Sequence, residues 1–225
     1  MEPNELKTNN KYYFSVDGET EELYLDHLQQ LINNCDKATK KVKLVHDKCS
    51  VTKKAKKIPA IYSVRVFHLC DYESNSAEHV KNFQQVLKDL RNVSKINKCL
   101  KYGLGYSNFT FELWIVLHKK QLKSHLNDRT QYLKHINEAF GENFESLDEY
   151  KKKENFKKVL AKITLNDVIS AIDRAEEIRK THEKLGEIIT YGKFNYCKEN
   201  PDLTVHECIR EILEDCGIIT KKKDT

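Results

Sequence analysis

The chain has 225 residues, of which 39% are hydrophobic and 32% are charged. This length corresponds to one domain, or to one domain with a small appendage, at roughly 100–200 residues per domain. The apolar content excludes a disordered chain, and no stretch approaches the roughly 18 consecutive apolar residues of a membrane span. The net charge of +5 excludes a strongly acidic protein, but it is too small to indicate nucleic-acid binding by itself.

The seven cysteines show no C-x-x-C spacing, so neither a zinc knuckle nor a redox motif is predicted. Residues 1–5 contain no apolar segment of the kind found in a secretory signal. We therefore expect a cytoplasmic protein with reduced thiols. No G-x-x-x-x-G-K motif is present, so ATP hydrolysis by that route is not expected of this chain.

The first half of the chain alternates between predicted strands and helices. Strands are predicted at three β-prone runs, residues 12–16, 61–69 and 99–106. A helix with apolar residues at spacings of three and four is predicted over residues 21–33, and a second one follows the N-capping residues 74–76. This order predicts a parallel sheet flanked by helices. The apolar run at residues 111–117 fits a helix or a strand equally well.

The second half is predicted to be mainly helical. Residues 151–162 form a basic amphipathic segment, and residues 164–167 resemble a capping box for a helix that ends near residue 184. A clearer capping box at residues 204–207 precedes an apolar stripe that Gly217 can terminate. We expect an α/β core at residues 10–122 and a mainly helical region at residues 123–225 packed on it.

Lysines gather in the stretch between residues 40 and 57, where Asp47 is the sole acid. Such a patch can hold phosphate groups, or it can be a solvated loop. The lysines that we consider for contacts with a phosphate backbone are Lys53, Lys54, Lys56, Lys57 and Lys119.

Acidic residues follow the first two predicted strands. Asp17 and Glu21 come after the first strand, and Asp71 and Glu73 come after the second. Residues i and i+2 of an extended segment point the same way, so Asp71 and Glu73 are expected to converge. Ligand sites of parallel sheets lie at the carboxyl ends of the strands. Converging carboxylates need a cation, and oxygen ligands select one or two Mg²⁺ or Mn²⁺ ions, which can activate water and clamp a phosphate.

The same acids have a plainer explanation. Acidic residues are ordinary in the first turn of a helix, where they interact favourably with the helix dipole. An acid after a buried strand is also common, so each motif taken alone is weak, and the joint placement carries the prediction.

Four segments resemble one known family. Residues 14–24 resemble the E-G-x-T-E motif of Toprim-fold proteins, specifically the RloB-like family, and Asp71-Tyr72-Glu73 resembles their D-x-D element. The most specific segment, residues 107–118, is similar to the family signature S-N-P-x-F-E-L-W-x-x-x-H. Residues 200–206 resemble its N-P-x-T-x-V-H stretch. The resemblance spans nearly the whole chain.

This resemblance implies a fold and a function. The expected fold is α/β, a Toprim-like and mostly parallel sheet sandwiched by helices, with a helical C-terminal appendage. Toprim domains bind Mg²⁺ or Mn²⁺ through the motif acids and act on phosphodiesters. RloB-like proteins occur in bacterial antiphage and abortive-infection systems, commonly beside a separate ATPase. The resemblance therefore implies a metal-dependent nuclease that cuts RNA such as tRNA, or DNA, as the toxic effector of such a system.

The chain departs from the family pattern at three positions. The first acid is Asp17 where the family usually has Glu, and the second motif ends in Glu73 where it has Asp. The proline of the third motif is Phe109. Each substitution of an acid keeps a carboxylate, but it changes the reach of the side chain by one methylene.

The sequence assigns provisional roles to these residues. Asp17, Glu21, Asp71 and Glu73 are the predicted metal ligands and catalytic acids, with Asp17 the general acid or base. Gly18 is expected to let the backbone approach a phosphate closely. The residues considered as further ligands or supports of the site are Ser107, Asn108, Glu112 and His118; for His118 a structural role is equally compatible with the sequence.

Two other functions remain open at this level. Because Asp17 replaces Glu, the chain could be a catalytically weak regulatory or nucleic-acid-binding subunit of such a complex. It could also be a Toprim enzyme that acts on nucleotides or synthesises primers. The products formed with a nucleic-acid or nucleotide substrate distinguish these alternatives.

Overall fold

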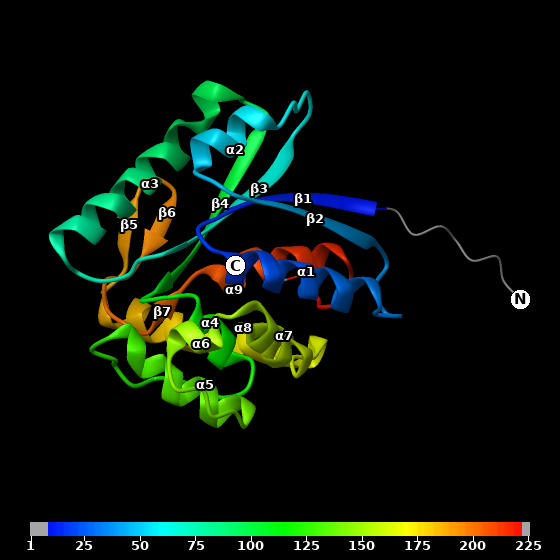
Figure 1. The fold of residues 1–225 in the computed structure, drawn as a ribbon. Coiled ribbons are helices and arrows are strands. Elements are labelled where there is room, and N and C mark those ends of the chain that lie inside the picture. The colour runs from blue at the N-terminus through cyan, green and yellow to red at the C-terminus, as the bar shows by residue number, and fades with distance from the viewer. Residues whose placement is uncertain (1–8, 222–225) are drawn as a thin grey trace, which may run out of the picture.

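The structure is a computed structural model that describes residues 9–221, so the expectation drawn from residues 1–5 lies outside the described part. A five-stranded sheet with the order β2-β1-β3-β4-β7 runs through the centre of the molecule (Figure 1). Its four parallel strands are β1 (Asn9–Val16), β2 (Lys41–Lys48), β3 (Val64–Asp71) and β4 (Leu100–Asn108). The short strand β7 (Asp202–Leu203) pairs with β4 in the antiparallel direction. This architecture confirms the predicted α/β class.

Helices cover both faces of the sheet because alternate residues of the buried strands are apolar on both sides. One face packs against α2 (Val51–Lys57), α3 (Ala77–Ile96) and the hairpin of β5 (Ile189–Tyr191) and β6 (Phe194–Tyr196) (Figure 1). The other face carries the remaining helices, which are α1 (Glu19–Asn33), α4 (Glu112–Leu117), α5 (Tyr132–Phe140), α6 (Leu147–Tyr150), α7 (Lys153–Ala161), α8 (Leu165–Leu185) and α9 (Val205–Asp215), with a short 3₁₀ turn at Arg129–Gln131.

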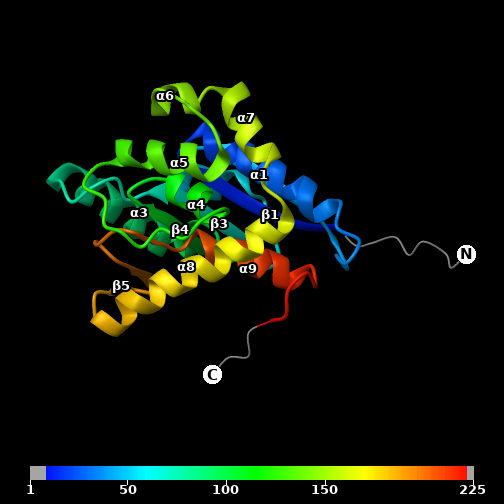
Figure 2. The ribbon, with the colours of Figure 1, turned by 90° about the horizontal axis from the view of Figure 1, so that it is seen from below.

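The helix α9 packs against β4 over a strand position that has no side chain. A Cβ atom at Gly105 would stand 2.6 Å from Leu69 Cδ2 and 3.1 Å from Cys208 Sγ. Glycine at this position therefore lets the helix approach the strand closely. The helices α8 and α9 lie side by side beneath the sheet (Figure 2).

The lysine stretch is not the loop that its composition allows. It forms β2 and α2, because Val42 and Leu44 alternate with polar residues and point into the core. Ser50 then starts α2 by accepting a hydrogen bond from the Lys53 backbone N–H.

The run at residues 111–117, which the sequence left between helix and strand, is the buried helix α4. The predicted capping box of α8 is confirmed, with Thr164 and Asp167 bonded reciprocally. The predicted box of α9 is wrong: the Thr204 hydroxyl donates to the Leu104 carbonyl instead, because Thr204 lies against β4.

The C-terminal region contributes directly to the central sheet. Strand β7 pairs Leu203 with Ser107 and Asp202 with Asn108. The division expected at residue 122 thus falls between parts of the chain that share one sheet. Among residues 9–221, no helix combines the length and the apolar character needed to cross a bilayer.

Candidate functional site

Three of the four acids singled out in the sequence, Asp17, Glu21 and Asp71, meet at the carboxyl ends of the parallel strands. Strands β1 and β3 are neighbours in register, with Val16 opposite Leu69, so the residues that follow them lie side by side. The backbone N–H of Asp71 donates to the Asp17 carboxylate. This register brings the first and second motifs together, as the sequence predicted.

Asp17 lies at the mouth of this acidic site, with 52% of its side chain exposed. Partial burial, and next the negative charge of Glu73, raise its pKa to about 6, although the nearby Lys48 acts in the opposite direction. The pKa of Asp17 is therefore close to the range that suits proton transfer near neutral pH. His68 Nε2 lies 3.9 Å from Asp17 Oδ1, and Ser15 Oγ lies 2.9 Å from His68 Nδ1.

Glu21 is buried in the first turn of α1. Its carboxylate turns back onto the helix start, where it accepts hydrogen bonds from its own backbone N–H and from Thr20 Oγ1 at 3.0 Å. Burial, together with the charges of Glu112 and Asp17, nevertheless raises its pKa to about 7. Gly18 makes this position possible, because a Cβ there would stand 2.7 Å from Glu21 Oε2.

Asp71 is strongly perturbed by its surroundings. Burial, and then the charges of Glu21 and Glu112, raise its pKa well above its ordinary value. Its Oδ1 atom is buried and has no hydrogen-bond partner within the described chain. An unpaired buried carboxylate oxygen is costly, and a cation that it could coordinate would remove that cost. The donor set at this position therefore fits a hard divalent ion.

Glu112 joins the cluster from the first turn of α4, at 1% exposure. Thr110 Oγ1 donates to Glu112 Oε2. Lys151, which directly follows α6, places its Nζ 3.1 Å from Glu112 Oε1 and forms an ion pair with it. Burial opposes the charge on Lys151, but the carboxylates of Glu112, Asp71 and Glu21 outweigh that effect and raise its pKa. The structure thus adds one cation that the sequence analysis did not single out.

Glu73 does not converge with Asp71 in the way the i, i+2 spacing predicted. Its backbone lies in the left-handed region, with φ of 62°, so the segment is not extended there. The Glu73 carboxylate leaves the line of β3 and reaches His79 Nε2 at 2.7 Å. It still influences Asp17 through its charge, but it lies at the rim of the acidic site and not among the buried acids.

Ser107 and Asn108 support the site from the end of β4. Ser107 is opposite Asp71 in the β3–β4 pair, and its backbone carbonyl accepts a hydrogen bond from the Tyr72 N–H. Asn108 Nδ2 donates to the Lys198 carbonyl at 2.9 Å, and Tyr132 Oη donates to the Asn108 carbonyl at 3.2 Å. Both residues therefore fix the strand end and the loop beside it.

His118 is part of the core between α1 and α4. Nε2 lies 3.2 Å from Tyr24 Oη and Nδ1 lies 2.8 Å from the Trp114 carbonyl. Burial lowers its pKa to about 4, so the ring is neutral at physiological pH. Of the two roles that the sequence left open, the structural one fits this environment.

The candidate phosphate-binding lysines divide into two groups. Lys53, Lys56 and Lys57 are exposed on α2. Lys54 is buried, with Nζ donating to Asp47 at 2.6 Å and to the Val45 carbonyl at 3.0 Å, and Lys119 Nζ donates to Asp167 at 2.7 Å. Internal partners therefore already occupy the ammonium groups of Lys54 and Lys119, and exposed Lys57 also pairs with Asp47 at 3.4 Å.

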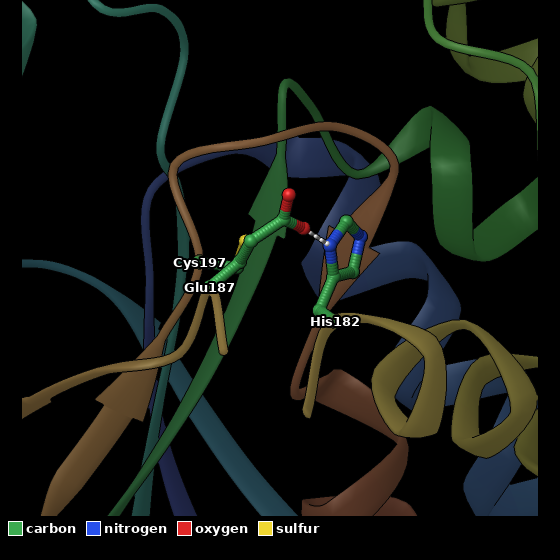
Figure 3. A group of neighbouring side chains, drawn as sticks. All are labelled: His182, Glu187 and Cys197. Atoms are coloured by element: carbon green, nitrogen blue, oxygen red, sulfur yellow. Dashed lines mark hydrogen bonds and ion pairs between the residues drawn. The ribbon is translucent and has the colours of Figure 1, made fainter. Parts of the chain in front are cut away.

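A second group of possible metal ligands lies elsewhere, among His182, Glu187 and Cys197 (Figure 3). Within residues 9–221 it is the group of at least three His, Cys, Asp or Glu residues whose ligand atoms all lie within 4.8 Å of one another. The sequence analysis missed it because the three residues follow no recognised spacing. The acids at the strand ends are more widely spaced than this, so binding of an ion there requires their side chains to turn inward.

The fold and the acids at its strand ends define an α/β protein with a carboxylate-rich site at the edge of a parallel sheet. The model of the RloB-like protein family matches residues 12–212, and the chain belongs to this family. Comparisons with curated proteins and with solved structures give no match.

Proposed function

We propose that the protein is a metal-dependent nuclease whose active site is the acidic cluster of Asp17, Glu21, Asp71 and Glu112. One observation carries the proposal: these acids gather with Lys151 as their paired cation, and the buried Oδ1 of Asp71 has no partner among the described residues. An oxygen-only set of this kind selects Mg²⁺ or Mn²⁺. Membership of the RloB-like family supports the same function through the motif resemblance.

The chain's own residues supply binding and proton transfer. When bound, a divalent ion would neutralise charge on a phosphate and acidify a bound water. Asp71, Glu21 and Glu112 are the residues that would hold it. Asp17, exposed at the mouth and with its pKa raised to about 6, exchanges a proton with the attacking or leaving oxygen. Lys48, which lies close enough to act on the Asp17 charge, contacts the substrate backbone.

The substrate of this nuclease is a nucleic acid, RNA such as tRNA or DNA, because the motif resemblance implies action on phosphodiesters. The family resemblance supports the role of toxic effector in a bacterial antiphage system, with a separate ATPase controlling it. Exposed Lys53, Lys56 and Lys57 on α2 extend the basic surface from the end of β2 and contact the phosphate backbone.

A catalytically weak regulatory subunit is the second candidate. Two observations favour it. Asp17 is shorter than the usual Glu, and the Lys151 ammonium already neutralises part of the negative charge that a metal ion would otherwise neutralise. In that case the acids bind metal or a partner without turnover.

The deciding experiment is a cleavage assay on the purified protein with Mg²⁺ and with Mn²⁺, using plasmid DNA, single-stranded DNA and bulk tRNA. Cleavage of one substrate that requires metal is expected, and Asp71→Asn should lower its rate by about 100-fold or more, because the central ligand is lost. Glu21→Gln should have a similar effect, whereas Glu73→Gln, at the rim, should lower the rate by less than about 10-fold.

Circular dichroism of each variant separates a lost ligand from a lost fold. If no substrate is cut while Mn²⁺ binds, the assay is repeated with the neighbouring ATPase added. Failure of that complex to cut would leave the regulatory subunit as the function. Equal cleavage by wild type and Asp71→Asn would remove the acidic cluster from the chemistry.

A further inference from the structure

His182, Glu187 and Cys197 come together at the far end of α8. His182 lies in the last turn of that helix. Gly186 follows in the left-handed conformation, with φ of 71°, and the Glu187 N–H donates to the His182 carbonyl at 3.0 Å. This six-to-one bond closes the helix end and returns Glu187 to His182. Cys197 reaches the same point from the residue after β6 (Figure 3).

The hydrogen bonds of His182 fix which of its nitrogens faces the other two residues. Nε2 lies 2.9 Å from the Pro201 carbonyl, which can only accept, so Nε2 carries a proton. Nδ1 lies 2.6 Å from Glu187 Oε2. If the ring is neutral, Nδ1 and the carboxylate both present lone pairs to each other. Such a contact requires a positive charge, supplied either by a proton on Nδ1 or by a cation that both atoms bind.

Cys197 makes the cation the more complete explanation. Its side chain is fully buried, and the backbone N–H of Glu199 hydrogen-bonds to its sulfur, a contact that favours the thiolate. A proton on His182 would account for the contact with Glu187, whereas a bound cation would engage Nδ1, the carboxylate and Cys197 Sγ together. Burial raises the pKa of the Cys197 thiol to about 11, and a coordinated cation deprotonates such a thiol outright.

We propose that His182 Nδ1, a Glu187 carboxylate oxygen and Cys197 Sγ bind one zinc ion. The ligand atoms all lie within 4.8 Å of one another, and a tetrahedral zinc ion holds its ligands about 3.5 Å apart, so small side-chain movements complete the site. A set of one nitrogen, one oxygen and one sulfur suits zinc and not Mg²⁺, which avoids thiolate ligands. The Pro201 carbonyl orients the imidazole from the second shell.

The proposed ion adds a link between segments that hydrogen bonds already bring together, among them the bond of His182 to the Pro201 carbonyl. It ties the end of α8 to the β5–β6 hairpin, and through Pro201 to the residues that enter β7. Asn108 Nδ2 at the end of β4 donates to the carbonyl of Lys198, directly after Cys197. The proposed ion therefore holds the loop that lies against the strand end of the acidic cluster, with three protein ligands and a fourth position left for water.

The test is metal analysis together with cobalt spectroscopy on the full chain. Protein saturated with zinc and then desalted should retain about one ion per chain. Replacement by Co²⁺ should give the near-ultraviolet absorption of a cobalt–thiolate bond. The variant Cys197→Ser should abolish this absorption. It should also weaken zinc binding by about 100-fold or more, because loss of a direct ligand costs more affinity than loss of a residue that only orients a ligand. His182→Gln should weaken binding to a similar extent.

Cys99→Ser is the matched control, because Cys99 is a partly buried free cysteine in another part of the fold. It should leave both readouts unchanged. The proposal is overturned if the desalted wild type holds no zinc and gives no cobalt–thiolate absorption, or if that absorption survives in Cys197→Ser. The wild-type measurement decides the question even if a variant does not fold, and since none of the readouts is cleavage, it is independent of the nuclease proposal.

Discussion

The acidic cluster and the triad of His182, Glu187 and Cys197 are assembled in different ways. The acids come from β1, β3 and the helices that follow β1 and β4, and they share one place because parallel strands end at the same edge. The triad comes from a helix end and a hairpin, and a left-handed glycine brings two of its members together. The first arrangement follows from the topology of the fold, and the second from a single local turn of the chain.

The two sites also differ in how their charges are balanced. In the acidic cluster burial and mutual repulsion raise the pKa of Asp17, Glu21 and Asp71. In the triad the acid already has a nitrogen at 2.6 Å. The cluster therefore stores unfavourable electrostatic energy that a divalent ion can release, whereas in the triad the nitrogen and the carboxylate already face each other and a cation would bind between them. This difference leads to the following expectations.

The largest expected effect is a crossed loss of metal binding. Asp71→Asn should weaken Mn²⁺ binding by about 100-fold while leaving the zinc content unchanged, because the two ligand sets share no residue. Cys197→Ser should do the reverse. Isothermal titration with Mn²⁺ and elemental analysis for zinc measure the two affinities on the same preparations. A variant that loses both ions with its fold intact would show that the sites are not separate.

The next effect is on the pH dependence of stability. The pKa of Glu21 is raised from 4.5 to about 7 in the folded protein, so ionisation of Glu21 destabilises the fold. Relative to wild type, Glu21→Gln should gain about 3 kcal/mol of unfolding free energy between about pH 4 and about pH 8. The gain should appear as the pH rises from the pKa of Glu21 in the unfolded chain, 4.5, through its pKa in the folded protein, about 7.

Urea denaturation without metal, at several pH values, measures this difference. The comparison with the variant is needed because burial lowers the pKa of His68 and of His118 to about 4. These two histidines make the protein more stable as the pH rises from their pKa in the folded state, about 4, to their pKa in the unfolded chain, 6.5. This effect is opposite to that of Glu21. A stability difference between wild type and variant that does not change with pH would show that Glu21 is not perturbed.

The smallest expected effect concerns Lys151. Lys151→Met should leave Glu112 buried without its partner at 3.1 Å and lower the free energy of unfolding near neutral pH. Because the Lys151 side chain is 39% exposed, the loss should be about 1 kcal/mol and not the larger value of a fully buried pair. Thermal unfolding should show it, and Lys152→Met, at an exposed neighbouring residue, is the control. An equal loss in both variants would mean that the ion pair contributes nothing.

The sequence predicted those parts of the molecule that depend on regular patterns. Alternating elements gave the parallel sheet, and the residues after its first two strands gave the meeting of Asp17 and Asp71. The helices α1, α3 and α9 followed from apolar spacing, and α8 followed from its capping box. Strand β2 was missed, because its lysines hid the alternation of Val42 and Leu44.

The failures arise where tertiary contacts override a local rule. Glu73 was expected beside Asp71, but its left-handed backbone sends it to His79. Thr204 was expected to cap α9, but it bonds to the Leu104 carbonyl of β4. Lys151 and the triad were not identified, because their partners are distant in the sequence or arranged by a turn that no motif describes.

Strand β2 is the last strand on its side of the sheet, with β1 as its neighbour within the described chain. An open strand edge can pair with a strand of another molecule, which is a route to aggregation. Here the Val42 N–H and carbonyl are bonded to the Asn33 side chain, and the Leu44 N–H donates to Gln29 Oε1, so α1 already covers part of this edge. Lys41, Lys43 and Lys48 lie along this strand, and Lys43 and Lys48 are exposed. Bringing two such edges together would place like charges against each other, so these lysines protect the protein against self-association.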